Sequence, residues 1–280
     1  MDSYKKILII GAGGALGIPI LNEFLDSAYE ASVLSRKEST ATFPDGMKIF
    51  KADYKDFAEV KAAMEGQDAV ISNVGGHAAG DQQIFVDAAL ATGCLSSSLI
   101  PPYKKALVDY LRTKEKQISW TALITGGFFE WGMGNGFFGF DLPNKTATLT
   151  DDGVSAWAST TMGKIAGAIK ASLDHADETK NQYVFVSSFH HTQREILDII
   201  EKVDGKKWNV VHVKSEDLLA NGKRRVQSGD FAGIMDLTRG IATGKLGLVN
   251  LRPHGLWNEK LGLPEEDLEA ALKRIVEKTF

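Results

Sequence analysis

The chain has 280 residues, of which 44% are hydrophobic and 24% charged, and a formal net charge of −4 at pH 7. This length is enough for one large hydrophobic core, or for a core with a modest second lobe. The slightly acidic balance gives no electrostatic footprint for nucleic acid or anionic lipid. No stretch approaches 18 consecutive apolar residues, and we expect neither a membrane span nor a signal peptide, so the expected location is cytoplasmic. Cys94 is the only cysteine, which excludes internal disulfides and cysteine-based zinc sites.

The first pattern along the chain is a strand, a glycine-rich turn and a helix. An apolar run over 6–10 precedes the turn, and an apolar-periodic stretch follows it. Gly11 permits a sharp turn, Gly14 lets the backbone approach phosphate oxygens, and Gly17 allows close packing of the helix on the sheet. Free N–H groups and the positive end of the helix dipole hold the anion. The pattern predicts a dinucleotide pyrophosphate site formed by Gly11, Gly14, Ala15, Leu16 and Gly17, with the helix beginning near Ala15.

The end of the second strand indicates which dinucleotide binds. The strand 31–34 runs into Ser35-Arg36-Lys37, where an NAD site normally carries an acidic residue for the ribose 2′-hydroxyl. Arg36 can bind a 2′-phosphate with its two-pronged guanidinium, and Lys37 adds a second cation, which favours NADPH as the cofactor. The alternative is that both residues merely solubilise a loop.

The first half of the chain alternates strands and helices, which predicts parallel strands with helices on both faces. Further strands are expected at 48–51 and 68–72, and helices at 57–64 and 82–91. Asn73-Val-Gly-Gly76 closes the fourth strand at the carboxyl edge of the sheet, where ligands bind in this architecture. We therefore expect Asn73 and Gly75 to contact the cofactor. His77 follows and is interpreted as an exposed loop residue.

The alternation of strands and helices becomes less regular after Gly93. The expected fifth strand reads Cys94-Leu-Ser-Ser-Ser-Leu-Ile100 and ends in two prolines, which makes it a poor strand. A helix over 104–114 and a convincing buried strand over 120–125 restore the pattern. Phe128, just after that strand, is a further expected cofactor contact.

Glycine and aromatic residues dominate the stretch from Glu130 to Trp157. Its rings either cover an apolar ligand or pack as a structural hairpin on the core. The first alternative predicts that Phe128–Phe140 borders the substrate pocket. His190-His191 lacks a third ligand nearby, so no metal site is expected.

These elements predict an α/β fold, a Rossmann-like doubly wound parallel sheet with a small C-terminal α+β substrate lobe. Residues 1–128 are expected to form the NAD(P)-binding domain. Residues 129–280 are expected to complete the sheet and to form the lobe.

Several motifs in order resemble the NmrA-like and isoflavone reductase-like branch of the atypical short-chain dehydrogenases, in its fungal form. They are Gly11-Ala-Gly-Gly-Ala-Leu-Gly17, Leu34-Ser-Arg-Lys37, Gly66-Gln-Asp-Ala-Val-Ile-Ser-Asn-Val-Gly-Gly76, Ser119-Trp-Thr-Ala-Leu-Ile-Thr125, Gly127-Phe-Phe129 and Thr179-Lys-Asn-Gln-Tyr183. The resemblance covers nearly the whole chain. It implies NADPH as cofactor and reduction of a small aromatic or polyketide-like molecule. The NmrA side of the family implies an alternative, a non-catalytic NADP-binding regulator that acts through a protein partner.

The resemblance also implies a catalytic lysine. Reductases of this group carry one at the start of the helix that precedes the strand ending here in Ile124. Matching Val108-Asp-Tyr-Leu111 to that helix puts Lys104 at this position, with Lys105 one residue away. Such a lysine would hydrogen-bond or protonate the substrate oxygen; the alternative is an exposed lysine in the first helical turn. No Tyr-x-x-x-Lys pair is present at either lysine.

The chain departs from the family between Gly93 and Pro101. The family's fifth strand and an extended loop are expected to be missing there. Such a deletion exposes the neighbouring strands unless the residues near 95–100 substitute, and it puts catalytic competence in question.

Overall fold

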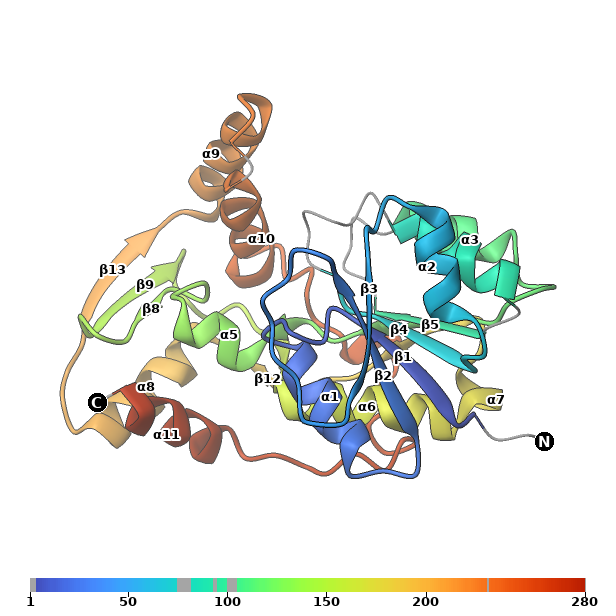
Figure 1. The fold of residues 1–280 in the computed structure, drawn as a ribbon. Helices are drawn as coiled ribbons and strands as arrows, with labels where there is room; N and C mark the ends of the chain where they lie inside the picture. The colour runs from blue at the N-terminus through green and yellow to red at the C-terminus, as the bar shows by residue number, and fades with distance from the viewer. Residues whose placement is uncertain (1–3, 75–81, 93–94, 100–104, 231, 280) are drawn as a thin grey trace. The chain divides into compact units, whose positions relative to one another are not determined.

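The computed structural model describes residues 4–74, 82–92, 95–99, 105–230 and 232–279. The chain forms two compact units (Figure 1). Unit 1 comprises residues 1–124, 165–185 and 257–263, and unit 2 comprises residues 125–164, 186–256 and 264–280. The chain therefore enters unit 2 at Thr125 and returns twice to unit 1.

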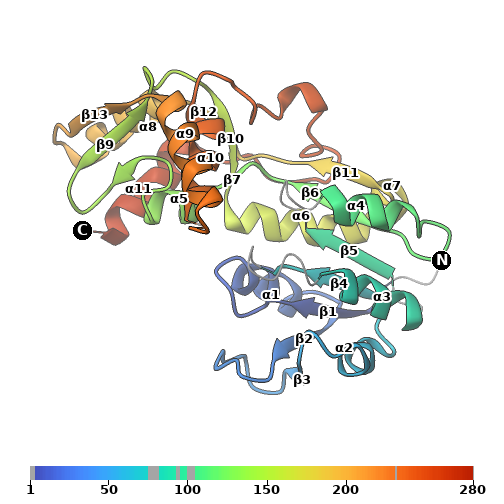
Figure 2. The same ribbon diagram turned by 90° about the horizontal axis from the view of Figure 1, so that it is seen from above.

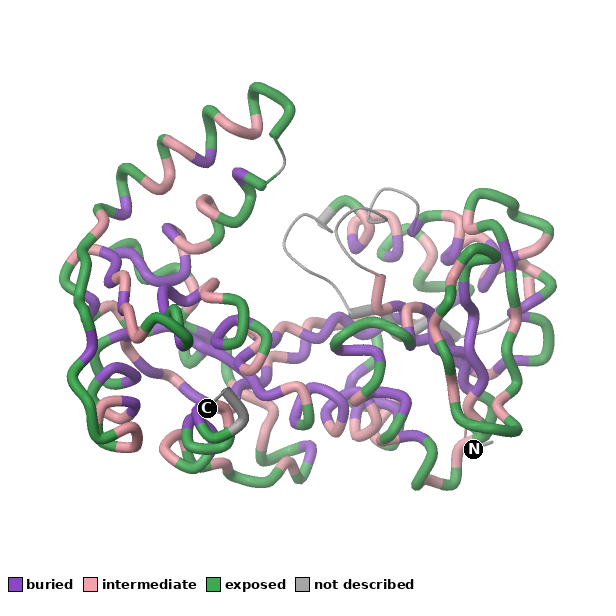
Figure 3. Tube along the Cα trace, turned by 60° about the vertical axis from the view of Figure 1, so that its left-hand side comes forward, coloured by how far each residue is buried: buried purple, intermediate pink, exposed green. Residues whose placement is uncertain are grey.

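Unit 1 is built on a seven-stranded sheet in the order β11-β6-β5-β4-β1-β2-β3, and every pairing in it is parallel. The strands are β1 (Lys6–Ile10), β2 (Glu30–Arg36), β3 (Lys48–Ala52), β4 (Ala69–Ser72), β5 (Leu95–Leu99), β6 (Thr121–Ile124) and β11 (Gln182–Phe185). Buried residues run along the central strands (Figure 3), as expected for strands covered on both faces. The order 3-2-1-4-5-6 confirms the predicted Rossmann-like doubly wound sheet.

Helices cover both faces of this sheet. They are α1 (Gly17–Leu25), α2 (Phe57–Met64), α3 (Gln82–Thr92), α4 (Lys105–Arg112), α6 (Met162–Asp174) and α7 (Ala176–Thr179). In Figure 1, α1 and α6 lie on one face, and α2 and α3 lie on the other. Asp56 caps α2, because its carboxylate accepts hydrogen bonds from the N–H groups of Ala58 and Glu59.

A fifth strand is present at Leu95–Leu99, so these residues take the place of the family strand that is expected to be missing. In β5, Leu95 pairs with Ala69 of β4, and Ser98 pairs with Ala122 of β6. Strand neighbours on both sides supply hydrogen-bond partners for the backbone, and this tertiary context outweighs the low strand propensity of three serines. Loss of the extended loop that the family carries after this strand stays a prediction.

Unit 2 is a mixture of helices and small sheets, as expected for an α+β lobe. One sheet has the order β12-β10-β7, and the other has the order β13-β9-β8. The strands are β7 (Gly127–Phe128), β8 (Phe140–Asp141), β9 (Thr146–Thr150), β10 (Trp157–Thr160), β12 (Phe189–His191) and β13 (Asn209–Val213). The helices are α5 (Phe129–Gly134), α8 (Gln193–Asp204), α9 (Ser215–Gln227), α10 (Gly233–Thr243), a 3-10 turn at Arg252–His254 and α11 (Leu268–Thr279). Helices α9 and α10 pack side by side (Figure 2).

Most rings of the glycine and aromatic stretch form the core of unit 2. Phe129, Phe138, Phe140 and Trp157 are each at most 1% exposed, and the rings of Phe138 and Trp157 lie 5.5 Å apart. The ligand-covering interpretation is therefore wrong for these four rings, because they pack against the apolar residues of the same unit. Trp131 remains 38% exposed and contacts the half-buried Phe137.

Candidate dinucleotide-binding site

The glycine turn after β1 has a backbone that only glycine tolerates. Gly11 has a φ of +83°, and a Cβ atom added to it would lie 2.2 Å from the carbonyl oxygen of Asn73. The chain after β4 is held here because the Asn73 N–H donates to the Ile10 carbonyl at 3.0 Å. The turn and the end of β4 thus meet at the carboxyl edge of the sheet, as the sequence predicts.

Gly17 brings the first helix close to this turn. A Cβ atom added to Gly17 would lie 2.1 Å from the Gly11 carbonyl oxygen, whereas one added to Gly14 would come no nearer than 3.4 Å. Helix α1 begins at Gly17, two residues later than expected. Leu16 at its N-cap makes no side-chain capping bond, and the first turn carries no acidic residue. The positive end of α1 is therefore left for an external anion, and the cradle fits a pyrophosphate.

Replacing Gly17 by alanine is expected to lower the free energy of unfolding by about 1–3 kcal/mol, because the new methyl group overlaps the Gly11 carbonyl. Gly14→Ala is the matched control. Its methyl group has room in the protein, so stability should stay within about 0.5 kcal/mol. Cofactor affinity should fall, because the sequence predicts that the backbone at Gly14 approaches the phosphates. Thermal or urea unfolding and calorimetric cofactor titration measure the two effects. Equal stability of both variants would contradict the packing role of Gly17.

The two basic residues at the end of β2, Arg36 and Lys37, differ in what they contact. The Lys37 ammonium forms a short ion pair with the Glu59 carboxylate of α2. This hydrogen bond raises the pKa of Lys37 and lowers the pKa of Glu59. Arg36 is 62% exposed, and its nearest carboxylate partner is the equally exposed Glu38 at 3.6 Å. The charge of Lys37 is therefore already matched within the protein, and of these two cations Arg36 has the weaker carboxylate contact and is the more open to a ligand.

The other predicted site residues are distributed as follows. Asn73 is half-buried beside the glycine turn. Phe128 lies on β7 in unit 2 and pairs with Thr160, so its contact with the cofactor stays a prediction. Lys105 is the first residue of α4. Three further predicted residues, Gly75, His77 and Lys104, lie outside the described residues, as does Cys94.

The two adjacent histidines of β12 lie in unit 2, and one of them is fully buried there. His191 is 1% exposed, and its Nε2 lies 2.7 Å from the Ser159 hydroxyl. Burial lowers the pKa of His191 to about 3, so the ring is neutral at physiological pH. Among the residues that the structure describes, no group of three His, Cys, Asp or Glu side chains is placed to hold a metal ion.

Two lysines outside the motifs were not singled out from the sequence. Lys51 on β3 donates to the carbonyl oxygens of Ser39 and Arg36, at the start of the loop after β2. Lys164 in unit 2 is buried, with its side chain 2% exposed, and lies 3.4 Å from the Glu266 carboxylate. A basic residue on an expected strand or helix carries no local signal for such a contact, because its partner is distant in the sequence.

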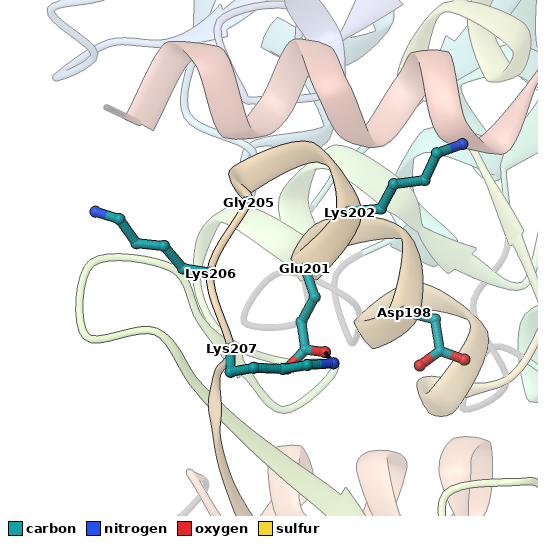
Figure 4. A pocket seen from close by; sticks show the side chains of 6 residues that line it. All are labelled: Asp198, Glu201, Lys202, Gly205, Lys206 and Lys207. Atoms are coloured by element: carbon teal, nitrogen blue, oxygen red, sulfur yellow. Dashed lines mark hydrogen bonds and ion pairs between the residues drawn. The ribbon is translucent and has the colours of Figure 1, made fainter.

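A shallow hollow at the C-terminal end of α8 is lined by charged side chains (Figure 4). Lys207 pairs with Glu201, and Lys202 pairs with Glu269 of α11. Lys202 and Lys206 extend away from the hollow on opposite sides (Figure 4). These lysines complement the negative end of the helix dipole, and the hollow is not a candidate for the dinucleotide site, which lies in unit 1.

No helix within the described part of the chain has the length and apolar character needed to cross a membrane.

Comparisons with known proteins identify an NAD(P)H-binding segment in the chain. Residues 11–117 match the NAD(P)H-binding family. The oxidoreductase aprR of Aspergillus flavus is 30% identical over 293 aligned residues, which cover 97% of this chain and 98% of that protein. The oxidoreductase poxI of Penicillium oxalicum is 26% identical, with 83% of this chain and 80% of that protein covered.

Solved structures show the same fold. The complex of leucoanthocyanidin reductase with NADPH from Vitis vinifera superposes with a TM-score of 0.77 at 18% identity, covering 97% of this chain and 99% of that one. An isoflavone reductase gives a TM-score of 0.76 at 20% identity, with the same coverage of both chains. The relationship to aprR over nearly the full length of both chains shows the family. The chain belongs to the isoflavone reductase-like family of NAD(P)H-binding oxidoreductases.

Proposed function

We propose that this protein is an NADPH-dependent reductase of a small aromatic or polyketide-like molecule. The observation that carries the proposal is the cradle formed by Gly11, Gly17 and the uncapped N-terminus of α1. Beside it, β2 ends in Arg36 with no acidic residue at the position that an NAD site uses for the ribose. A full-length relationship to an oxidoreductase accompanies both features.

The roles of the chain's own residues follow from this arrangement. The backbone N–H groups of the turn and of the first residues of α1 bind the pyrophosphate. Arg36 binds the 2′-phosphate through charged hydrogen bonds, and Asn73 holds the edge of the site against Gly11. When bound, NADPH supplies the hydride. Lys104 is the proposed proton donor or hydrogen-bond donor to the substrate oxygen.

The substrate class rests on the relatives. Similar proteins include an isoflavone reductase homologue of Zea mays, 26% identical, and a bifunctional pinoresinol-lariciresinol reductase of Thuja plicata, 23% identical. Each is named for an aromatic compound with oxygen substituents. Aromatic ketones and enones are therefore the first compounds to test.

The test is a titration of the purified protein with NADPH and NADH, followed by a turnover screen. Oxidation of NADPH in the presence of an aromatic ketone or enone, followed by nicotinamide absorbance, supports the reductase. Tight NADPH binding without turnover of any compound would favour the regulatory alternative. Absence of binding to either dinucleotide would contradict the proposed function altogether.

Arg36→Asp is expected to weaken NADPH binding by about 1–3 kcal/mol, the range for a lost charged hydrogen bond. NADH, which lacks the 2′-phosphate, should lose far less affinity. Calorimetric titration of both cofactors gives the two losses directly. Arg112→Asp, at the far end of α4, is the control for a change in overall charge. An equal loss for NADPH and NADH would show that Arg36 does not read the 2′-phosphate.

A further inference from the structure

The loop that joins β2 to β3 packs onto the glycine turn. A Cβ atom added to Gly13 would lie 2.6 Å from the Cβ atom of Ala41 and 3.7 Å from the ring of Phe43. Both loop side chains are half-buried. Because the loop touches the turn directly, a change in the loop's position affects the proposed pyrophosphate site as well.

Lys51 holds the beginning of this loop. It lies on β3, where it pairs in register with Ser35 of β2. Its ammonium donates to the Ser39 carbonyl at 2.9 Å and to the Arg36 carbonyl at 3.4 Å. An ammonium has three N–H donors, so one donor is left for a further acceptor. Lys51 is exposed, and that donor is accessible from solvent.

The three cations around the end of β2 differ in how closely a carboxylate contacts them. Lys37 is neutralised by Glu59. Arg36 has only a loose, exposed contact with Glu38 at 3.6 Å, and such contacts are worth little. For Lys51, no carboxylate within ion-pair distance occurs among the residues that the structure describes. Of these three cations, Arg36 and Lys51 are therefore the two without a close carboxylate partner among the described residues.

We propose that Lys51 is a specificity-determining residue of the cofactor site, whose ammonium binds the 2′-phosphate together with Arg36. The inference rests on the proposed function, because it assigns a residue to the same cofactor. A phosphate monoester carries close to two negative charges at neutral pH and three acceptor oxygens. The guanidinium of Arg36 matches two of these oxygens, and a lysine supplies a compact point charge for the remainder. The carbonyl contacts of Lys51 hold its ammonium next to the backbone of Arg36 before the ligand arrives.

Binding of two adenosine nucleotides tests the assignment without any substrate. The probes are 2′,5′-ADP, which carries the 2′-phosphate, and 5′-ADP, which lacks it. Lys51→Met keeps the length of the side chain and removes its charge. We expect it to weaken 2′,5′-ADP binding about 10- to 100-fold, as for other charged hydrogen bonds, and to change 5′-ADP binding less than twofold. The loss of 2′,5′-ADP affinity should be smaller at high salt, because salt screens exposed charges.

Two further variants separate charge from loop position. Lys48→Met removes another lysine of the same strand, one whose ammonium lies 4.7 Å over the Phe50 ring, and should leave both affinities unchanged. Lys51→Arg keeps the charge and should restore most of the preference for 2′,5′-ADP. Circular dichroism and thermal unfolding of each variant check that the fold is kept.

The losses of affinity for the two nucleotides distinguish a role in binding from a role in holding the loop. Equal losses for both nucleotides in Lys51→Met would show that Lys51 only holds the loop, and would overturn the assignment. If the wild-type protein prefers 2′,5′-ADP and the Lys51→Met variant keeps this preference, the role assigned to Lys51 is overturned while the proposed function is not. A wild-type protein that binds neither nucleotide would overturn the proposed function itself.

Discussion

Lys104→Ala is expected to lower turnover by roughly two to four orders of magnitude while NADPH affinity stays nearly intact, as loss of general acid catalysis does. The family resemblance places this lysine at the start of α4. The described part of that helix is firmly held, because Val108 and Leu111 are fully buried against Trp120. The resemblance thus assigns the catalytic role to a position next to a well-packed element.

The measurement is single-turnover oxidation of NADPH with the best substrate from the screen, together with cofactor titration. Lys105→Ala, one residue along, shows which of the two lysines acts. Lys116→Ala, an exposed residue beyond the end of α4, is the control for loss of a positive charge. Full turnover in both the Lys104 and Lys105 variants would rule out lysine catalysis at this helix and strengthen the regulatory alternative.

Glu266→Gln is expected to lower the free energy of unfolding by about 3–5 kcal/mol, because it leaves a buried ammonium without its counter-charge. Lys164 is 2% exposed in its side chain, whereas Glu266 is 21% exposed. The two carboxylate oxygens also accept hydrogen bonds, one from the Thr161 hydroxyl and the other from the Ser188 hydroxyl, and glutamine keeps only one of these acceptors. The expected loss therefore combines the unpaired charge of Lys164 with one lost hydroxyl hydrogen bond. The double variant Lys164→Met/Glu266→Gln should recover much of the stability, since no isolated charge remains.

Urea unfolding of these two variants, and of one control variant, measures the effects. Glu269→Gln is the matched control, because Glu269 forms an ion pair with Lys202 at 2.7 Å, but that pair is 45–68% exposed. Exposed pairs contribute about 0–1 kcal/mol, so this variant should unfold almost like the wild type. If Glu266→Gln proves no less stable than Glu269→Gln, the buried pair does not contribute as argued.

The parts of the fold that the sequence predicts are those set by local rules. The turn at Gly11 needs a positive φ, which only glycine adopts freely. A glycine at this place in the sequence therefore predicts the sharp turn. Strands β1 and β4 are nearly continuous apolar runs because both of their faces are covered. Their parallel arrangement could be predicted from the same pattern, and a cofactor site at their carboxyl ends stays a prediction.

The features that sequence reasoning missed depend on partners elsewhere in the chain. The strand at Leu95–Leu99 forms because β4 and β6 bracket it, and its own residues give little sign of this. Lys37 pairs with a glutamate 22 residues away, a contact that its own place in the sequence does not indicate, and its role at the cofactor stays a prediction. The glycine and aromatic stretch has the same composition whether its rings face a ligand or a core, so only packing decides between the two.

The repeated passage of the chain between its two units has a consequence for synthesis on the ribosome. When residues up to Ile124 have emerged, β6 still lacks its neighbour, since β11 lies at Gln182–Phe185. Until then, β6 is an open sheet edge able to pair with other chains. The first part of unit 2 is thus translated before unit 1 is complete. The two units must therefore complete their folding together rather than one after the other. A chain truncated after Ile124 would keep that edge permanently unpaired.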